Sequence, residues 1–326
     1  MHSNRVVADR ALRKMKVSVL INNYNYAEYI EECLNSVGQQ SSSADETIVV
    51  DDGSTDHSVE VIKRHPLNVT CITQSNQGQL KAIATAVERA TGDILCFLDS
   101  DDRWKPGYLQ EIITAYNGPS RPDFVYVGLE RFGKKDGARR LCGFSTDTLI
   151  PASREILLAQ RIYVGAPTSG NSIRAHIAKD MVKAITPTQF EDYRINADNL
   201  LVFGASLIGC RKMQLRALLV DYRVHSKNNY YWQERNAKTK IADKLKREQL
   251  ISELAQELGL ESDIYKLYDE FREQLEYTCE KSELIKAYLK APKKFKKICK
   301  PYWRIRFWLT YRIAKLKLNK VRQCSH

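Results

Sequence analysis

Cys-Phe-Leu-Asp-Ser-Asp-Asp, residues 96–102, is the stretch of this 326-residue chain that says most about its fold. The apolar run Ile94–Leu98 predicts a buried strand, and the strand ends in three carboxylates, Asp99, Asp101 and Asp102. Like charges resist being grouped, and a divalent cation with hard oxygen ligands, Mg²⁺ or Mn²⁺, removes that cost. Such a cation commonly holds a diphosphate. The alternative is an acidic turn that caps the helix after Trp104, since Asp is a good N-cap.

The residues before this stretch alternate between strand and helix patterns. Further short strands are predicted at Val17–Ile21, Thr47–Val50 and Val69–Ile72, and helices at Glu28–Val37, Val59–Lys63 and Gly78–Ala90. Such repeats predict an α/β fold with a mostly parallel central sheet flanked by helices, which binds ligands beyond the carboxyl ends of its strands. Polar clusters occupy those ends at residues 22–25, 51–56 and 99–102.

The second half of the chain has weaker patterns. A fifth strand is predicted at Phe124–Val127, a hairpin or loop at Gly133–Gly143, and a late strand at Ala217–Val220. From about residue 234 the pattern is helical and highly charged.

Composition indicates a globular protein that works in a reducing compartment. Hydrophobic residues make up 43% of the chain, yet no apolar run approaches the roughly 20 residues that span a bilayer. The first 16 residues lack the apolar core of a signal peptide. The eight cysteines are scattered without a Cys-x-x-Cys pair, which favours reduced thiols. We therefore expect a cytoplasmic location.

The net charge of +12 is concentrated at one end of the chain. Residues 286–326 hold 14 of the 51 Lys and Arg residues and no acidic residue, so the remainder has 37 basic against 39 acidic residues. Residues 292–322 also contain aromatic side chains: Phe295, Tyr302, Trp303, Phe307, Trp308 and Tyr311. This mixture suits an anionic membrane surface. A helix packed on the protein is an open alternative, and nucleic acid is the least favoured partner.

The ordered set of motifs resembles the inverting glycosyltransferases of family 2, of bacterial type, which have the GT-A nucleotide-diphospho-sugar transferase fold. The matching segments are Val17–Asn25, Val49–Asp56, Asn76–Gln79, Gly92–Asp102, Thr168–Asn171, Ala197–Asp198 and Tyr222–His225. The resemblance covers about residues 16–232. Three positions depart from it: Asn23 stands where many relatives carry Pro, Ile83 where a basic residue is common, and Ala84 where Asn is usual.

The resemblance implies a division into parts. Residues 1–232 would form the transferase domain, with a nucleotide-binding half at about 16–130 and an acceptor half at about 131–232. Residues 233–326 would form a helical C-terminal extension with the basic aromatic tail. Through that tail the protein would be peripheral on the inner face of the cytoplasmic membrane.

The resemblance also implies a donor site made of ten residues. They are Asn23, Tyr24, Asn25, Asp51, Asp52, Asn76, Gly78, Lys81, Asp99 and Ser100. A carboxylate after the second strand can accept a hydrogen bond from a uracil or thymine N–H. Structural alternatives stay open: an Asx-turn at Asp51–Gly53, strand-end packing for Tyr24, and a solvated position for Lys81.

The metal site and the catalytic base follow from the same resemblance. Asp101 of the Asp-x-Asp motif would bind Mg²⁺ or Mn²⁺, with His225 completing the site or contacting the diphosphate; a buried structural histidine is the alternative. Asp102 is interpreted as the helix cap. Asp198 would be the general base that deprotonates the acceptor hydroxyl, in preference to its neighbours Glu191 and Asp192.

The predicted function is therefore metal-dependent, inverting transfer of a sugar. The donor would be a nucleotide-diphosphate sugar carrying UDP or dTDP, and the acceptor a hydroxyl of a glycan or a lipid-linked molecule. The alternatives are a catalytically inactive scaffold that binds a nucleotide or glycan, and a basic-tailed protein that binds nucleic acid.

Overall fold

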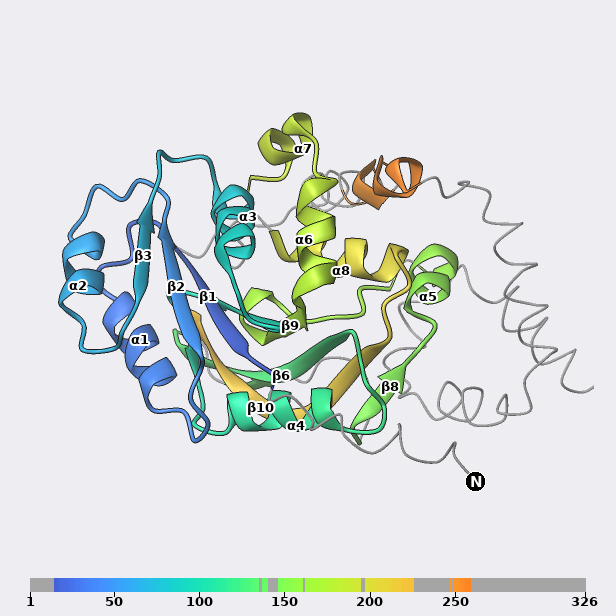
Figure 1. Cartoon of the computed structure of the whole chain (residues 1–326), viewed down its shortest axis with the longest axis horizontal. Coiled ribbons are helices and arrows are strands. Elements are labelled where there is room, and N and C mark those ends of the chain that lie inside the picture. Colours follow the sequence, from blue (N-terminus) through green and yellow to red (C-terminus); the bar gives the residue numbers. More distant parts are fainter. Residues whose placement is uncertain are drawn as a thin grey trace, which may run out of the picture. The chain divides into compact units, whose positions relative to one another are not determined.

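A computed structural model describes residues 15–134, 137–139, 146–160, 162–194, 197–225, 247, 249–251 and 253–258. All of them lie in the first of the two units into which the chain divides, Met1–Glu273. The part described is an α/β structure built on one central sheet (Figure 1), which confirms the predicted fold class.

The first four long strands form the parallel part of the sheet. They are β1 (Val17–Asn23), β2 (Glu46–Asp51), β3 (Thr70–Thr73) and β4 (Ile94–Asp99), in the spatial order β3-β2-β1-β4. Nearly every residue of β1 and β4 is buried, as expected for strands covered on both faces. The register pairs Asn22 with Asp99 and Asn23 with Asp51, so the polar strand ends meet at one edge.

The sheet becomes mixed beyond β4. Strand β9 (Asn171–Arg174) lies between β4 and β6 (Phe124–Gly133) and is antiparallel to both. Strand β10 (Lys212–Val224) runs parallel to β6 and antiparallel to the short strand β5 (Arg103–Trp104). Strand β7 (Gly137–Arg139) pairs antiparallel with β6, which confirms the hairpin, and β8 (Thr148–Ile150) pairs with β10.

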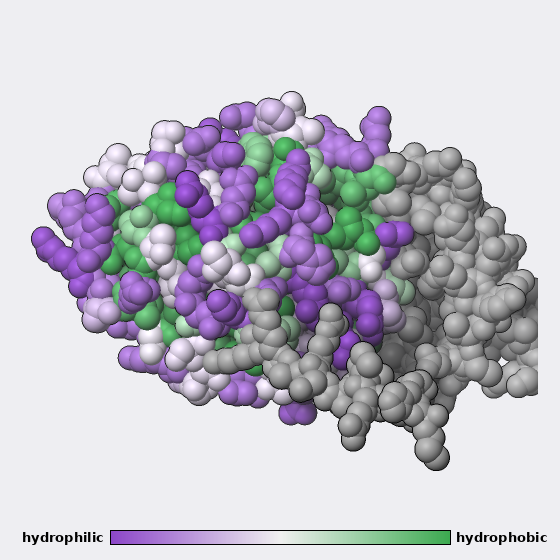
Figure 2. Space-filling view, viewed as in Figure 1, coloured by the Kyte–Doolittle hydropathy of each residue, from purple (hydrophilic) through white to green (hydrophobic). Residues whose placement is uncertain are grey.

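Helices cover both faces of the sheet. Those in the described part are α1 (Ile30–Gly38), α2 (Ser58–Arg64), α3 (Gln79–Arg89), α4 (Tyr108–Asn117), α5 (Ser153–Gln160), α6 (Ala175–Lys183), α7 (Pro187–Asp192) and α8 (Ala197–Leu207), with a 3₁₀ turn, η1, at Thr168–Gly170. In Figure 1, α3, α6 and α8 lie on one side of the sheet and α4 on the other. Hydrophilic side chains cover much of the face seen in Figure 2, with apolar side chains showing between them.

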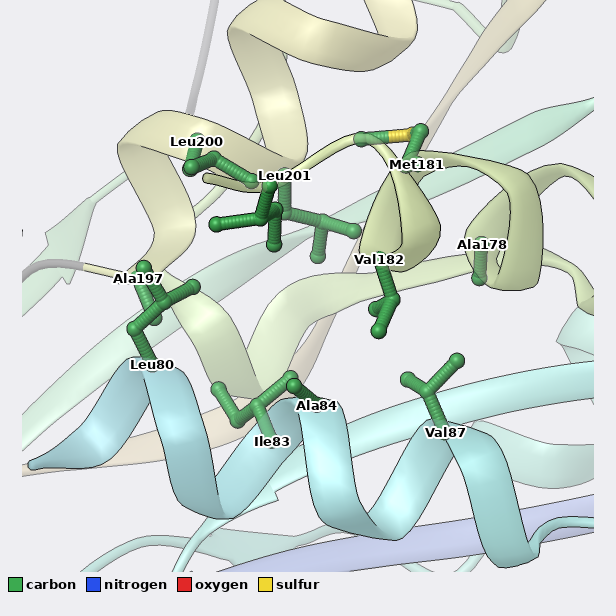
Figure 3. Close-up of a pocket in the computed structure, with 11 residues that line it drawn as sticks. Leu80, Ile83, Ala84, Val87, Ala178, Met181, Val182, Ala197, Leu200 and Leu201 are labelled. Carbon is green, nitrogen blue, oxygen red and sulfur yellow. The ribbon is translucent and has the colours of Figure 1, made fainter. Parts of the chain in front are cut away.

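Helices α3, α6 and α8 meet around a small apolar hollow of about 20 Å³ (Figure 3). Ile83 and Ala84, two of the positions that depart from the family pattern, belong to its lining and are buried. The helix face that carries them therefore packs against neighbouring helices.

One structural prediction is wrong. Asp102 does not cap a helix, because β5 follows it and α4 begins only at Tyr108, after an N-cap glycine without a side-chain bond.

Other predictions fall on residues that are not described. The basic tail at 292–322 and most of the proposed extension at 233–326 lie outside the described residues, although residues 247, 249–251 and 253–257 are helical. Among the described residues, no helix has the length and apolarity needed to cross a bilayer.

Candidate active site

Three carboxylates meet where β4 ends. Each of Asp99, Asp101 and Asp102 offers an oxygen, and these oxygens lie within 4.8 Å of one another. Asp101 and Asp102 are buried, with 8% and 1% of their surface exposed. The grouping of acids predicted from residues 96–102 is thus present in the fold.

The cluster holds its negative charge at a cost. Burial, and then the charge of Asp101, raise the pKa of Asp99 to about 7. Burial and the charges of Asp101 and Asp99 raise the pKa of Asp102 well above its usual range. Both shifts have the sign expected of carboxylates that share a poorly solvated site, and a bound cation would oppose them.

Buried oxygen atoms without partners among the described residues lie at the ends of β1 and β4, the strand ends where the acids meet. Ser100 Oγ, Asn22 Oδ1 and Asn23 Oδ1 are buried, and none finds a hydrogen-bond partner within the part of the chain that is described. Orphaned buried oxygens are uncommon in native proteins. The three carboxylates of the cluster are hard oxygen donors of the kind that Mg²⁺ and Mn²⁺ prefer.

His225 is brought to the cluster by the end of β10. Its Nε2 lies 2.9 Å from Oδ2 of Asp101, and the residue is 6% exposed. Its ring lies 4.9 Å from that of Tyr29 and 5.6 Å, edge-on, from that of Tyr26. Burial and the charges of the three carboxylates raise the pKa of the Tyr26 hydroxyl, so Tyr26 too lies in the field of the cluster.

Arg223 ties the end of β10 to the same acids. Its backbone N–H donates to Asp102 Oδ1 over 2.8 Å, and its Nε donates to the carbonyl of Asp101 over 2.8 Å. Its guanidinium also pairs with Glu32 of α1, which pairs in turn with Arg103. Backbone and side chain of Arg223 thus fix the loop that carries Asp101.

Ser169, in η1, links two acids of the cluster to Trp104 of β5. Its Oγ donates to Asp102 Oδ2 over 2.6 Å and accepts the backbone N–H of Asp99 over 3.1 Å. Its carbonyl accepts the indole N–H of Trp104 over 2.8 Å. The side chain of Asp102 is therefore used in holding the site together.

The two acids at the end of β2, Asp51 and Asp52, are buried and hydrogen-bonded within the protein. Asp51 accepts bonds from Asn23 Nδ2 and from the N–H and hydroxyl of Ser54. Asp52 accepts the backbone N–H groups of Gln77 and Gly78 over 2.9 and 2.7 Å. The bonds from Ser54 to Asp51 match the alternative that Asp51 forms an Asx-turn. Direct contact of either acid with a nucleotide stays a prediction.

The remaining donor-site candidates after β1 lie around the same turn. Asn25 has a φ of 56°, and its Oδ1 accepts the backbone N–H of Thr55 over 2.8 Å. Tyr24 is 45% exposed, so the strand-end packing alternative does not describe it. Its side chain is accessible to a ligand.

The segment before α3 contacts Arg194. Arg194 Nη2 donates to Asn76 Oδ1 over 2.7 Å. Gly78 has a φ of 94°, and a Cβ there would come within 2.8 Å of Arg194. Lys81 Nζ lies 4.6 Å from the ring centre of Phe190, a cation–π contact.

Asp198 lies in the first turn of α8. Its Oδ2 accepts the Tyr163 hydroxyl over 3.0 Å, and its charge is close enough to raise the pKa of Asp99. The rival acids Glu191 and Asp192 are exposed on α7, and Glu191 pairs with Arg194 at 3.7 Å. Of the three candidates, Asp198 is the one whose charge acts on the cluster.

Comparisons with known proteins agree with this arrangement. A family model described as Glycosyl transferase family 2 matches residues 18–178. An uncharacterized glycosyltransferase of Nostoc sp., alr2836, is 35% identical over 225 residues, which cover 66% of this chain and 67% of that protein. The chain belongs to glycosyltransferase family 2. It is thus a glycosyltransferase of the nucleotide-sugar type, with the acid cluster inside the matched region.

One other relative and two solved structures are also similar to this family 2 glycosyltransferase. TuaG of Bacillus subtilis, a putative teichuronic acid biosynthesis glycosyltransferase, is 38% identical over 103 residues, covering 30% of this chain and 40% of TuaG. The crystal structure of S. aureus TarS 1-349 in complex with UDP has a TM-score of 0.58 at 21% identity, covering 82% of this chain and 73% of that one. TarS 1-349 in complex with UDP-GlcNAc gives 0.54 at 18% identity, covering 74% and 72%. At these identities the likeness shows the fold.

Four residues of the glycosyltransferase site were not singled out from sequence. Ser169 and Arg223 lie inside matching segments, Thr168–Asn171 and Tyr222–His225, so the motifs contained a signal for them. Gln79 donates to Asp99 over 2.9 Å, and Tyr163 bonds Asp198. Gln79 ends the matching segment Asn76–Gln79, so the motifs contained a signal for it as well. Nothing in the local pattern marks Tyr163, because its partner Asp198 lies 35 residues away in the chain.

Proposed function

We propose that this glycosyltransferase moves a sugar from a nucleotide-diphosphate donor to a hydroxyl of a glycan or lipid-linked acceptor, with inversion and with a divalent cation. The observation that carries the proposal is the cluster of Asp99, Asp101 and Asp102, whose oxygens lie within 4.8 Å of one another. The charge of Asp198 contributes to the raised pKa of Asp99, which supports Asp198 as the base. An inverting transfer needs a base at the acceptor side of a site whose other side receives the diphosphate.

In this proposal the chain's own residues divide the work. The carboxylate of Asp198 takes the proton of the acceptor hydroxyl. At the same time the oxygen of that acceptor hydroxyl bonds to the anomeric carbon of the sugar. The bond from that carbon to the phosphate oxygen breaks, and the nucleoside diphosphate leaves with the electron pair. The Tyr163 hydroxyl, 3.0 Å from Asp198, keeps the base oriented.

Asp101, Asp99 and Asp102 are proposed to hold Mg²⁺ or Mn²⁺, with His225 beside Asp101. A bound cation would neutralise the diphosphate and favour its departure. The support is the close approach of the three carboxylates, whose oxygens lie within 4.8 Å of one another, and the raised pKa values of Asp99 and Asp102. Because Asp102 already accepts bonds from Ser169 and Arg223, Asp101 is the ligand we favour.

The donor base is proposed to be uracil or thymine. The support is the fold shared with TarS, whose structures contain UDP and UDP-GlcNAc. Exposed Tyr24 and the bonded pair Asn23–Asp51 would border the base. For the acceptor, the relative TuaG is named for teichuronic acid biosynthesis, in keeping with a glycan hydroxyl.

Calorimetry on the full chain tests the donor site. UDP and dTDP are titrated with and without Mn²⁺, beside Asp101→Ala and, as a matched surface control, Asp180→Ala. We expect binding that depends on Mn²⁺ and is lost only in Asp101→Ala. If neither nucleotide binds at millimolar concentration with Mn²⁺, the donor proposal is wrong.

Turnover tests the transferase step and the base. A panel of UDP- and dTDP-sugars is incubated with octyl glycosides, and product is followed by mass spectrometry. We expect Asp198→Asn to lose transfer by about a hundredfold or more while it still binds nucleotide, and Asp192→Asn to stay near wild type. Nucleotide binding without any turnover would favour the inactive scaffold instead.

A further inference from the structure

One side chain bridges the two sides of the site. Gln79, the first residue of α3, donates from Nε2 to Asp99 Oδ1 over 2.9 Å. Its Oε1 accepts the backbone N–H of Ala197 over 3.4 Å. Ala197 is the first residue of α8 and precedes Asp198. A single amide therefore touches both the acid at the end of β4 and the helix that carries the proposed base.

The chemistry of the two partners calls for an amide. An ionised carboxylate only accepts hydrogen bonds, and a backbone N–H only donates. The bridging group must therefore donate at one end and accept at the other. Gln does both with one planar group. Glu would place a second carboxylate against Asp99, and Met would fill the same length without either bond.

The backbone around Gln79 is held on both sides. Asp52 accepts the N–H groups of the two preceding residues, Gln77 and Gly78. The N–H of the following residue, Leu80, donates to the carbonyl of Arg194 over 3.3 Å. Arg194 also holds Asn76. These bonds fix the backbone of Gln79. Its side-chain amide can therefore set the distance between the Asp99 carboxylate and the backbone of Ala197.

We propose that Gln79 is a positioning residue for sugar transfer, which keeps the strand-end acid Asp99 and the base-bearing first turn of α8 at a working distance. The inference rests on the proposed function, because it takes Asp198 as the base. Displacements of about 1 Å between reacting groups can cost on the order of a hundredfold in rate. Loss of the bridge would therefore slow transfer more than it weakens nucleotide binding.

The test uses Gln79→Met and Gln79→Glu in the full chain. Gln77→Met is the control, since Gln77 is exposed in the same loop and its side chain bonds, within the part of the chain that is described, to Ser75 alone, at 3.4 Å. Amide hydrogen exchange at Ala197, measured by NMR without nucleotide or metal, reports the bridge itself. Turnover of the best sugar nucleotide and octyl glycoside pair, and calorimetry with UDP and Mn²⁺, report its consequence.

We expect Gln79→Met to speed exchange at Ala197 about fivefold or more. Its kcat should fall about ten- to a hundredfold while the Kd for UDP stays within about threefold. Gln79→Glu should lose at least as much kcat, because its carboxylate repels Asp99. Gln77→Met should match the wild type throughout.

Unchanged exchange at Ala197 in Gln79→Met would overturn the bridge. Faster exchange with an unchanged kcat would overturn the positioning role, as would a parallel loss of kcat and UDP binding. If the wild type transfers no sugar although Ala197 still responds to Gln79→Met, the proposed function fails and the bridge is a structural tie alone.

Discussion

His225 Nε2 lies 2.9 Å from Oδ2 of Asp101, although 124 residues separate them in the chain. Strand β10 makes the contact, because its parallel pairing with β6 and antiparallel pairing with β5 carry its last residues to the end of β4. The rings of Tyr26 and Tyr29 pack on the histidine. The contact therefore joins the end of β10 to the acids that follow β4.

Replacing this histidine should weaken cation binding. We expect His225→Ala to weaken Mn²⁺-dependent UDP binding about ten- to a hundredfold, the usual cost of losing a ligand's partner in a metal site. Calorimetry measures it, with the exposed His176→Ala on α6 as control. Nucleotide affinity equal to wild type in His225→Ala would leave the histidine a structural role only.

Loss of the hydroxyl should change the free energy of unfolding differently at two buried serines beside the acids, Ser169 and Ser100. Ser169 Oγ bonds Asp102 and Asp99, so Ser169→Ala should lower the free energy of unfolding by about 1–3 kcal/mol. Ser100 Oγ has no partner among the described residues, so Ser100→Ala should be neutral or stabilising without ligand. Urea unfolding without metal compares them, and equal losses would contradict the assignment.

Nucleotide binding adds a second contrast between the serines. If Ser100 serves the donor or its cation, Ser100→Ala should weaken Mn²⁺-dependent UDP binding although its stability is intact. Calorimetry with UDP and Mn²⁺ measures it. An unchanged Kd would mean that the orphaned hydroxyl does not serve this ligand.

Glu32 should make a pH-dependent contribution to stability. Burial opposes its charge, but the hydrogen bonds from Arg223 and Arg103 outweigh burial and lower its pKa below the ordinary 4.5. A lowered pKa in the folded state adds stability above about pH 4.5, and that stability is lost as the pH falls through the folded value. Since the side chain is 41% exposed, solvent screens the pair, and we expect Glu32→Gln to cost about 1 kcal/mol at pH 7.

That cost should shrink toward zero as the pH falls below about 4. Urea unfolding at several pH values measures it. Glu31→Gln is the control, because Glu31 is exposed in the same first turn of α1 and shares the helix-dipole effect. A wild-type advantage over Glu32→Gln that grows on acidification would reverse the assigned sign.

Sequence predicted the parts of this site that are local. The apolar run before Asp99 and the acids after it sit within nine residues, so a buried strand ending in acids was visible. Strand β9 was missed because Asn171 and Ser172 are polar, yet both are fully buried and hydrogen-bonded to the backbone of other segments. Such burial depends on partners that no local pattern reveals.

The Asp102 assignment failed for a related reason. A short run of acids before a helix resembles a cap, and only the pairing of β5 with β10 shows that the chain first enters the sheet. Order and spacing of motifs located Asp198, but its contact with Tyr163 and the bridge from Gln79 of α3 to Ala197 of α8 join segments that are far apart in sequence.

The departure of this chain from the family pattern at Ala84 has its own consequence. Ala84 is 1% exposed and lines the apolar hollow between α3, α6 and α8 (Figure 3). The hollow has room for about one water, but its apolar lining offers few hydrogen bonds to hold one. Restoring the usual residue with Ala84→Asn would bury an amide there. We expect the free energy of unfolding to fall by about 1–3 kcal/mol, as urea unfolding would show.

Thr85→Asn is the control, since Thr85 is the neighbouring residue, is half-buried and already bonds Gln74 at 2.9 Å. The free energy of unfolding should fall less in Thr85→Asn than in Ala84→Asn, because an amide at position 85 has a polar partner and solvent within reach. If Ala84→Asn were as stable as the wild type and bound UDP more tightly, the face of α3 that carries residue 84 would still be able to contact the nucleotide donor. Loss of stability with unchanged UDP affinity would show instead that α3 has exchanged a polar family position for packing against α6 and α8.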